Sequence, residues 1–222
     1  MENRIHIFVG HFGSGKTETA LNFAVKQAKD GKKVDIVDLD TVNPYFRTAD
    51  AKEILETYGI NVIASDFAGS NVDIPTVPTE TQKVFADKDA VGIIDVGGDE
   101  DGAFALGRYK REFENEKYQM HFVVNTKRPL TQNADDIIEY IESVEKASRL
   151  KVTDIFNNTN LADETTGDVL AEGYAELLKV SDRTGIPVVY NCGTKKTLEN
   201  MACKNFEMEI FLKKPWENRK DR

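Results

Sequence analysis

The sequence predicts an α/β fold of three layers, in which helices cover both faces of a mostly parallel sheet of about seven strands. Two observations carry this prediction. Short apolar runs rich in Val and Ile recur along the chain, which is typical of strands buried on both faces. Longer stretches with a helical spacing of apolar residues lie between those runs, so strand and helix alternate throughout.

The expected elements follow one another in a regular order. Each strand is an apolar run bounded by turn residues, and the strands are expected at residues 4–9, 34–38, 61–64, 91–95, 121–125, 153–157 and 187–191. Several helices begin after an Asp, Asn or Thr that can cap them, and the helices are expected at residues 16–30, 46–58, 79–86, 103–116, 131–148, 168–184 and 205–212. Surface loops are expected at residues 65–78 and 158–167.

Length and composition indicate one soluble domain. The 222 residues are enough to bury a core without disulfides, and no linker or repeat divides the chain. We expect a single domain over residues 1–222, with a core of about 4–191 and a C-terminal helix and basic tail over about 204–222. The first strand begins at residue 4, which leaves no room for a secretory leader, so the cytoplasm is the expected location.

Charge and cysteine usage exclude several kinds of partner. The formal net charge of -9 opposes a nucleic-acid surface, because such surfaces need clustered Lys and Arg. Glu207 and Glu209 interrupt the expected C-terminal helix, which argues against stable membrane insertion. The two cysteines, Cys192 and Cys203, lack the spacing of a zinc or cluster site.

The segment between the first strand and the first helix carries the strongest motif. Residues 10–17 read GHFGSGKT, which satisfies the pattern GxxxxGK[ST] of a phosphate-binding loop, or P-loop. Glycines let backbone N–H groups surround phosphate oxygens, Lys16 reaches the β- and γ-phosphates, and the Thr17 hydroxyl binds Mg²⁺. A Gly-rich turn without a ligand is the alternative interpretation. The residues expected to contact a nucleotide are Gly10, Phe12, Gly13, Ser14, Gly15, Lys16, Thr17 and Glu18.

Carboxylates at the ends of two other strands match what a Mg²⁺ site beside a P-loop requires. Asp38 and Asp40 end the second strand, and Asp95 ends the fourth. Asp95 also begins a DxxG pattern in which the N–H of Gly98 can meet a γ-phosphate. Turn or helix-cap chemistry is the alternative for these acids. The expected metal-site residues are Thr17, Asp38, Asp40 and Asp95.

Together these residues resemble the superfamily of the nitrogenase iron protein and the partitioning and division-site ATPases (CobQ/MinD/ParA-like, SIMIBI), over residues 4–191. The resemblance implies that Lys16 and Asp40 act in catalysis, with Asp40 orienting the attacking water. It also implies that Asp95 contacts the Mg²⁺ shell and that Asp99 relays the nucleotide state. An asparagine that reads the base is implied as well, and the candidates are Asn157, Asn158 and Asn191.

The chain departs from that superfamily at two positions. His11 stands where the superfamily has an extra lysine, so activation in trans by that lysine is not expected. Residues 98–102 lack the cysteine that follows the second switch of the nitrogenase iron protein, so no iron–sulfur cluster is expected. A guanine site usually shows NKxD, whereas residues 125–128 read NTKR, which favours ATP over GTP.

The leading functional hypothesis is a Mg²⁺-dependent ATPase that works as a slow conformational switch on an unidentified protein partner. Nucleotide binding is expected to close a homodimer, and hydrolysis is expected to reshape the loops around Asp40 and Asp95. A small-molecule kinase or ligase with residues 65–78 as a substrate lid is the second hypothesis. A non-catalytic nucleotide-binding scaffold is the third.

Overall fold

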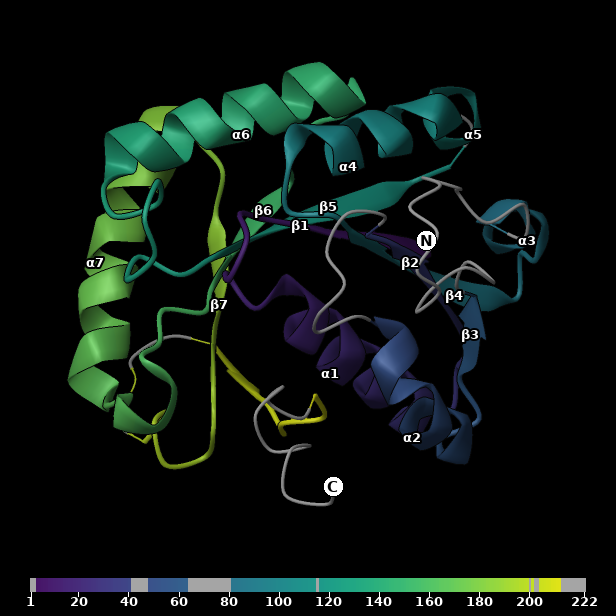
Figure 1. Cartoon of the computed structure of the whole chain (residues 1–222), viewed down its shortest axis with the longest axis horizontal. Coiled ribbons are helices and arrows are strands. Elements are labelled where there is room, and N and C mark those ends of the chain that lie inside the picture. Colours follow the sequence, from purple (N-terminus) through teal and green to yellow (C-terminus); the bar gives the residue numbers. More distant parts are fainter. Residues whose placement is uncertain are drawn as a thin grey trace, which may run out of the picture.

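The computed structural model describes residues 3–40, 48–63, 81–114, 116–199, 201 and 204–212. Its strands form one sheet in the order β3-β2-β4-β1-β5-β6-β7-β8 (Figure 1), and every neighbouring pair is parallel. The strands are β1 Ile5–Val9, β2 Lys33–Leu39, β3 Asn61–Ile63, β4 Ala90–Val96, β5 Tyr118–Val124, β6 Asp154–Asn157, β7 Val188–Gly193 and β8 Asn205–Glu207.

Helices cover both faces of this sheet, so the prediction of three α/β/α layers is confirmed. The α-helices are α1 Lys16–Lys29, α2 Lys52–Thr57, α3 Thr81–Ala86, α4 Glu100–Leu106, α5 Lys110–Glu114, α6 Ala134–Ser148 and α7 Gly167–Thr184. Short 3-10 turns lie at η1 Thr48–Ala51, η2 Gly107–Tyr109 and η3 Ala162–Glu164. The helix expected over residues 103–116 is therefore divided in two by η2.

The two faces bury separate cores because side chains alternate along each strand. In β1, Ile5 and Ile7 face a core that is covered by α3, α4, α5, α6 and α7. Phe8 faces the other core, which α1 and α2 cover. Figure 1 shows this division, with α4 and α6 above the sheet and α1 and α2 below it.

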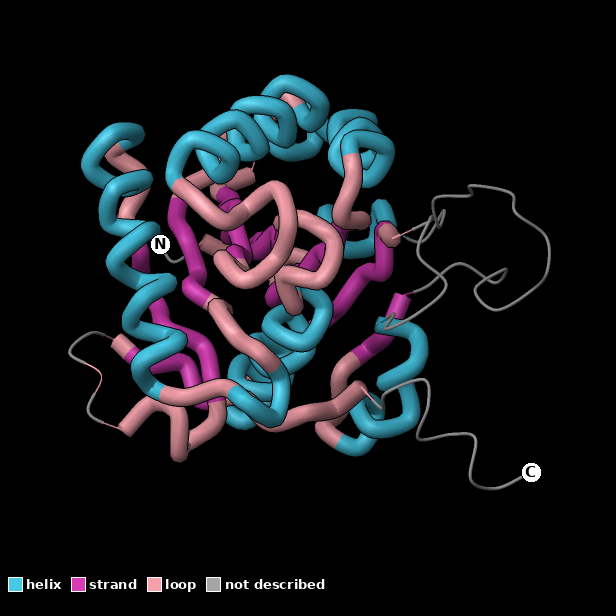
Figure 2. Tube along the Cα trace, turned by 60° about the vertical axis from the view of Figure 1, so that its left-hand side comes forward, coloured by secondary structure: helices cyan, strands magenta, loops and turns pink. Residues whose placement is uncertain are grey.

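The order of the strands places a ligand site at the carboxyl ends of the central strands. β1 lies between β4 and β5, and the chain builds outward from this centre to β3 on one side and to β8 on the other. Parallel α/β sheets bind ligands at such a switch point, outside the carboxyl ends of the strands. Figure 2 brings this edge forward and shows loops gathered inside a ring of helices.

The C-terminal helix expected over residues 205–212 is wrong. Residues 205–207 form β8, an eighth strand paired with β7, and the chain then runs along α1 without helical structure. Phe206, Met208 and Leu212 are buried in the core of the α1 face. Apolar residues at 206, 208, 210 and 212 alternate with residues 205, 207 and 209, which is strand periodicity. Residues 213–222 lie outside the described residues.

Asn22 fastens this C-terminal segment to α1. Its side-chain amide donates hydrogen bonds to the Glu209 carbonyl at 2.9 Å and to the Glu18 carbonyl at 2.8 Å. Its oxygen accepts the N–H of Glu209 at 2.8 Å. One buried side chain therefore satisfies both backbone groups of a residue that has no helical or sheet partner.

Replacing Asn22 with Ala should destabilise the protein. The Asn22→Ala change leaves the backbone groups of Glu209 without partners, which costs about 1–3 kcal/mol. Urea unfolding followed by circular dichroism measures the loss. Lys29→Ala is the matched control, because Lys29 on the same helix meets Glu209 only through an exposed ion pair at 3.8 Å, a contact worth at most about 1 kcal/mol. Equal losses of stability in the two variants would contradict the role of Asn22 in holding the C-terminal segment.

Candidate functional site

The P-loop leaves β1 and enters α1 through glycines that no other residue can replace without strain. Gly15 is the N-cap of α1 and has a φ of 83°, in the left-handed region. A Cβ on Gly15 would lie 2.2 Å from Asn158 Nδ2, and a Cβ on Gly10 would lie 2.3 Å from the Val123 carbonyl oxygen. No side chain caps the helix. The first turn of α1 therefore presents its N–H groups to an anion, as a phosphate-binding loop does.

Side chains from two other loops hold the P-loop in shape. Asn158 Nδ2 donates to the Ser14 carbonyl at 2.7 Å. Arg128 Nε donates to the Gly13 carbonyl at 3.2 Å. From the sequence, Asn158 was a candidate to contact the base of the nucleotide. In the structure its side-chain amide instead holds the P-loop through the Ser14 carbonyl. Arg128 was not predicted as a site residue, and only its place after β5 hinted at this role.

Lys16 lies beneath the loop against a buried carboxylate. Its ammonium nitrogen is 3.5 Å from Asp40 Oδ2, and both side chains are about 95% buried. Asp38 Oδ1 accepts the backbone N–H of Asp40 at 3.0 Å, which fixes the turn that ends β2. Asp38 and Asp95 are paired residues in the β2–β4 register. The structure thus brings together the three acids that the sequence singled out.

Asp95 carries the strongest electrostatic perturbation in this group. Complete burial, and then the neighbouring carboxylates of Asp38 and Asp40, raise its pKa to about 7 against the opposing effects of Lys16 and Thr17. Thr48 donates its hydroxyl to Asp95 Oδ2 at 3.0 Å. Among the described residues, the other oxygen, Oδ1, is buried without a hydrogen bond. A buried carboxylate with a free oxygen and like charges beside it is typical of a functional site.

These residues fit a Mg²⁺ ion that also has a nucleotide as ligand. Carboxylate and hydroxyl oxygens are donors of the kind that Mg²⁺ prefers. Within the described residues, no three His, Cys, Asp or Glu side chains are arranged to hold a metal ion by themselves. Thr17, Asp38, Asp40 and Asp95 are the residues that would hold the ion, directly or through bound waters.

The loop after β4 packs backbone against backbone on the P-loop. A Cβ on Gly98 would lie 2.8 Å from the Phe12 nitrogen, and a Cβ on Gly102 would lie 2.7 Å from the Gly97 carbonyl oxygen. Asp99 caps α4, with its Oδ1 accepting the Gly102 N–H at 2.8 Å. Its catalytic role stays a prediction. Gly102 was not singled out from the sequence, although a glycine inside a helix is a signal of close approach.

Two of the asparagines proposed to read the base are occupied inside the protein. Asn157 Nδ2 donates to Asn191 Oδ1 at 2.7 Å and to the Leu170 carbonyl at 2.9 Å. Asn157 Oδ1 accepts the backbone N–H of Thr159 at 3.2 Å, and both asparagines are fully buried. A base contact by either residue would require these bonds to break. Their role in base recognition stays a prediction.

Glu18, which was expected to contact the nucleotide, faces the C-terminal segment. Its carboxylate accepts the N–H groups of Phe211 at 2.5 Å and Leu212 at 3.2 Å. Burial raises the pKa of Glu18 to about 7, against these two bonds. The structure therefore joins the residue after Thr17 to the C-terminal segment, a contact across almost the whole chain.

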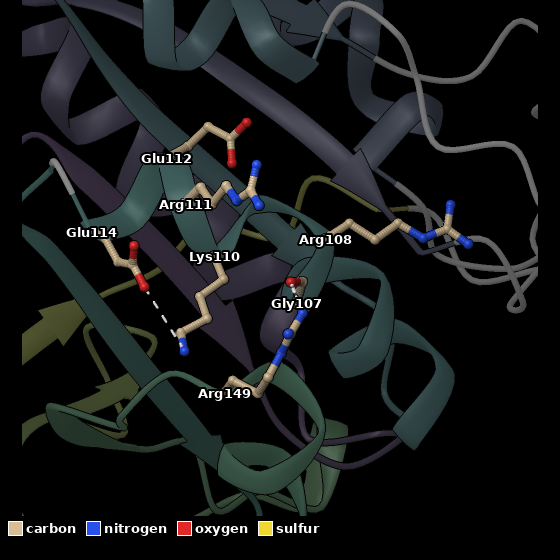
Figure 3. A pocket seen from close by; sticks show the side chains of 7 residues that line it. All are labelled: Gly107, Arg108, Lys110, Arg111, Glu112, Glu114 and Arg149. Atoms are coloured by element: carbon tan, nitrogen blue, oxygen red, sulfur yellow. Dashed lines mark hydrogen bonds and ion pairs between the residues drawn. The ribbon is translucent and has the colours of Figure 1, made fainter.

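A pocket among the described residues lies at the opposite edge of the sheet. It encloses about 530 Å³ at the amino-terminal end of the strands, where η2 and α5 lead into β5. Its basic side chains do not converge on one point: Figure 3 shows Lys110 turned to Glu114, Arg149 turned to the Gly107 carbonyl, and Arg108 pointing away. This pocket is separate from the P-loop.

This fold and this site define a P-loop nucleotide-binding domain. Residues 7–193 match the model of the CobQ/CobB/MinD/ParA nucleotide binding domain family. The chain belongs to that family. A search of curated proteins finds no match. Within the described residues, no helix is both long and apolar enough to cross a bilayer.

Several solved structures share the fold. Cell division protein FtsY from Thermotoga maritima superposes with a TM-score of 0.58 at 18% identity, covering 88% of this chain and 63% of its own. The signal recognition particle receptor FtsY from Elizabethkingia anophelis, in complex with GDP, superposes with a TM-score of 0.57 at 18% identity. The match covers 96% of this chain and 65% of that protein. The signal recognition particle 54 kDa protein from Aeropyrum pernix, in complex with GDP, superposes with a TM-score of 0.56 at 23% identity. The match covers 89% of this chain and 43% of that protein. The present chain thus spans less than two thirds of each of these proteins.

Replacing Asp95 with Asn should stabilise the nucleotide-free protein above pH 7. A folded pKa of about 7, against an ordinary value of 3.8 for an aspartate, means that the folded protein keeps a proton that the unfolded chain has lost. Stability therefore falls as the pH rises from about 4 to about 7. Asn cannot ionise, so we expect Asp95→Asn to gain roughly 2–4 kcal/mol at pH 8 and almost nothing near pH 4.

Urea unfolding at pH 8, 6 and 4.5 measures this difference. Asp35→Asn is the matched control, because Asp35 is buried on the same β2–β4 pair but accepts a hydrogen bond from Asn61 at 2.9 Å, outside the acidic cluster. A pH-dependent gain of the same size in Asp35→Asn would contradict the assignment of the effect to the cluster of Asp38, Asp40 and Asp95. A destabilised Asp95→Asn protein at pH 8 would show that the carboxylate is not under electrostatic stress.

Proposed function

We propose that this chain is a Mg²⁺-dependent nucleoside triphosphatase that works as a slow conformational switch on a protein partner. The buried Lys16–Asp40 pair beneath the P-loop is the observation that carries the proposal. A lysine and a carboxylate are costly to bury. A phosphate chain bound by the loop would explain why both are buried here, because Lys16 would bind the phosphates and Asp40 would bind the attacking water. The acids of β2 and β4 lie beside it, at the carboxyl ends of strands adjacent to β1.

Each residue then has a separate task. The N–H groups of the P-loop bind phosphate oxygens, and Lys16 turns from Asp40 toward the β- and γ-phosphates. Asp40, released from Lys16, holds the attacking water in line with the γ-phosphate and accepts its hydrogen bond. Thr17 and the buried carboxylates hold the Mg²⁺ shell. The ion, when bound, neutralises charge that develops on the phosphate oxygens.

ATP is the nucleotide that we propose. At the position where NKxD has its guanine-binding aspartate, this chain has Arg128, whose guanidinium is turned to the Gly13 carbonyl. An arginine cannot accept hydrogen bonds from guanine nitrogens. Two of the similar structures are complexes with GDP, which makes GTP the competitor to measure beside ATP. We expect the protein to act in the cytoplasm.

Lys16→Ala should abolish nucleotide binding and turnover. Calorimetry with Mg-ATP and with Mg-GTP gives the affinities, and phosphate release gives the slow turnover. We expect ATP to bind more tightly than GTP and both signals to vanish in Lys16→Ala. Lys29→Ala, on the exposed end of the same helix, should leave both unchanged. If the folded wild-type protein takes up neither nucleotide with Mg²⁺ present, the proposed function fails.

Exposed apolar side chains near the site support nucleotide-dependent dimerisation. Phe12 of the P-loop, Phe104 of α4 and Leu130 after β5 are 57%, 62% and 64% exposed. Large apolar side chains exposed beside a binding site are typical of a surface that is covered in another state. We propose a homodimer that closes over the triphosphate and presents the loops around Asp40 and Gly98 to the partner.

Light scattering with a non-hydrolysable triphosphate tests the dimer. The wild-type protein should double in mass with AMP-PNP and remain a monomer with ADP. Phe104→Glu should still bind nucleotide but lose the dimer, because an uncompensated charge would be buried at the contact. A monomer at saturating AMP-PNP would refute this part of the proposal.

A further inference from the structure

Tyr140 connects two loops that the proposed function requires to move. It lies on α6, and its hydroxyl donates a hydrogen bond of 2.9 Å to the Gly98 carbonyl. Its ring packs edge-on against His11, with ring centroids 5.2 Å apart, and against Phe122 of β5 at 5.9 Å. The Tyr140 side chain, which is held on α6 and packs on the core, thus contacts both the P-loop and Gly98, whose N–H is expected to meet the γ-phosphate.

The Gly98 loop is docked on the P-loop in this arrangement. A Cβ on Gly98 would lie 2.8 Å from the Phe12 nitrogen and 3.3 Å from the Gly10 carbonyl oxygen. The two loops therefore meet through their backbones with no side chain between them. The Tyr140 hydroxyl holds the docked loop from the side of α6.

The same arrangement keeps Lys16 away from a phosphate chain. Lys16 is paired with Asp40 at 3.5 Å, and Asp40 Oδ1 is 3.4 Å from a Cβ built on Gly97. A γ-phosphate would bring negative charge next to Asp40 and draw Lys16 away from it. The docked loop, the Lys16–Asp40 pair and the Tyr140 bond thus belong to one resting arrangement.

We propose that Tyr140 is a positioning residue that latches the Gly98 loop in this resting arrangement and so disfavours the triphosphate relative to the diphosphate. The inference rests on the proposed function, because it assigns a latch to the switch at the same site. A ligand shifts an equilibrium only by its difference in affinity for the two states. A hydrogen bond made in one state only shifts that equilibrium by about fivefold.

Tyr140→Phe tests the latch, because it removes the hydroxyl and keeps the ring on His11 and Phe122. Calorimetry with Mg²⁺ measures the affinities for ADP, AMP-PNP, GDP and GMP-PNP. We expect the affinity ratio of triphosphate to diphosphate to rise about fivefold for the nucleotide pair that binds. General damage to the P-loop would weaken both members of a pair and leave their ratio unchanged. An unchanged or lowered ratio overturns the proposal.

Tyr118→Phe is the matched control. Tyr118 lies at the start of β5 and packs on the same core, and its hydroxyl accepts the Lys151 N–H at 2.9 Å, at the opposite edge of the sheet. That variant loses an equivalent hydrogen bond without touching either loop. We expect its ratio to equal that of the wild type. An equal rise in Tyr118→Phe would assign the effect to lost stability and overturn the latch.

Hydrogen exchange of the nucleotide-free protein gives a readout that does not depend on binding. Amides of residues 97–102 should exchange about fivefold faster in Tyr140→Phe and at the wild-type rate in Tyr118→Phe. Equal exchange in all three proteins overturns the latch. A wild-type protein that binds no nucleotide defeats the proposed function and this inference together, whereas nucleotide binding with an unchanged ratio and exchange rate defeats the inference alone.

Discussion

The ion pair between Lys16 and Asp40 is the interaction on which the site depends. The ammonium group and the carboxylate are buried together, 3.5 Å apart, at a point where two further acids end their strands. Burial, and then the neighbouring carboxylates of Asp38 and Asp40, raise the pKa of Asp95, which reflects electrostatic repulsion among acids that lie together away from water. A cation or a redistribution of protons relieves it, which is why the arrangement suits a Mg²⁺-nucleotide site better than a purely structural role.

Around this charged centre the loops are fixed by close backbone approach. Gly15 meets Asn158, Gly98 meets the P-loop, and Gly102 meets Gly97, each at a distance that excludes a side chain. Loops packed in this way have few intermediate positions, so a shift of one requires a shift of its neighbour. A side chain such as Tyr140, which donates to the Gly98 carbonyl from α6, can therefore decide which arrangement is populated.

The sequence predicted the fold well because the central strands are buried on both faces and read as continuous apolar runs. It predicted the P-loop and the acids at the ends of β2 and β4 because each follows its strand directly. It failed at residues 205–212, where alternation at Phe206 and Met208 was taken for part of a helix. Three-residue strands give too few periods to be distinguished from helix by pattern alone. The break of the helix at Gly107 depends on the approach of α6, where a Cβ would lie 3.0 Å from the Ala147 carbonyl oxygen.

The supporting residues of the site were beyond prediction for a different reason. Arg128 reaches the P-loop from 115 residues away, Asn158 from 144, and Glu18 meets Phe211 across 193. Nothing in the local sequence around these residues marks the contact, because each depends on how parallel strands bring distant loops to one edge of the sheet. Glu18 illustrates the limit: its place after Lys16-Thr17 suggests a ligand to nucleotide, yet its carboxylate is turned to the C-terminal segment. A motif therefore fixes the chemistry of the loop that contains it, whereas the partners that position this loop follow from topology. In this chain those partners lie after β5, after β6, on α6 and after β8, so the P-loop is joined to both faces of the molecule. A protein partner that displaced any one of them would change the loop without contacting the nucleotide.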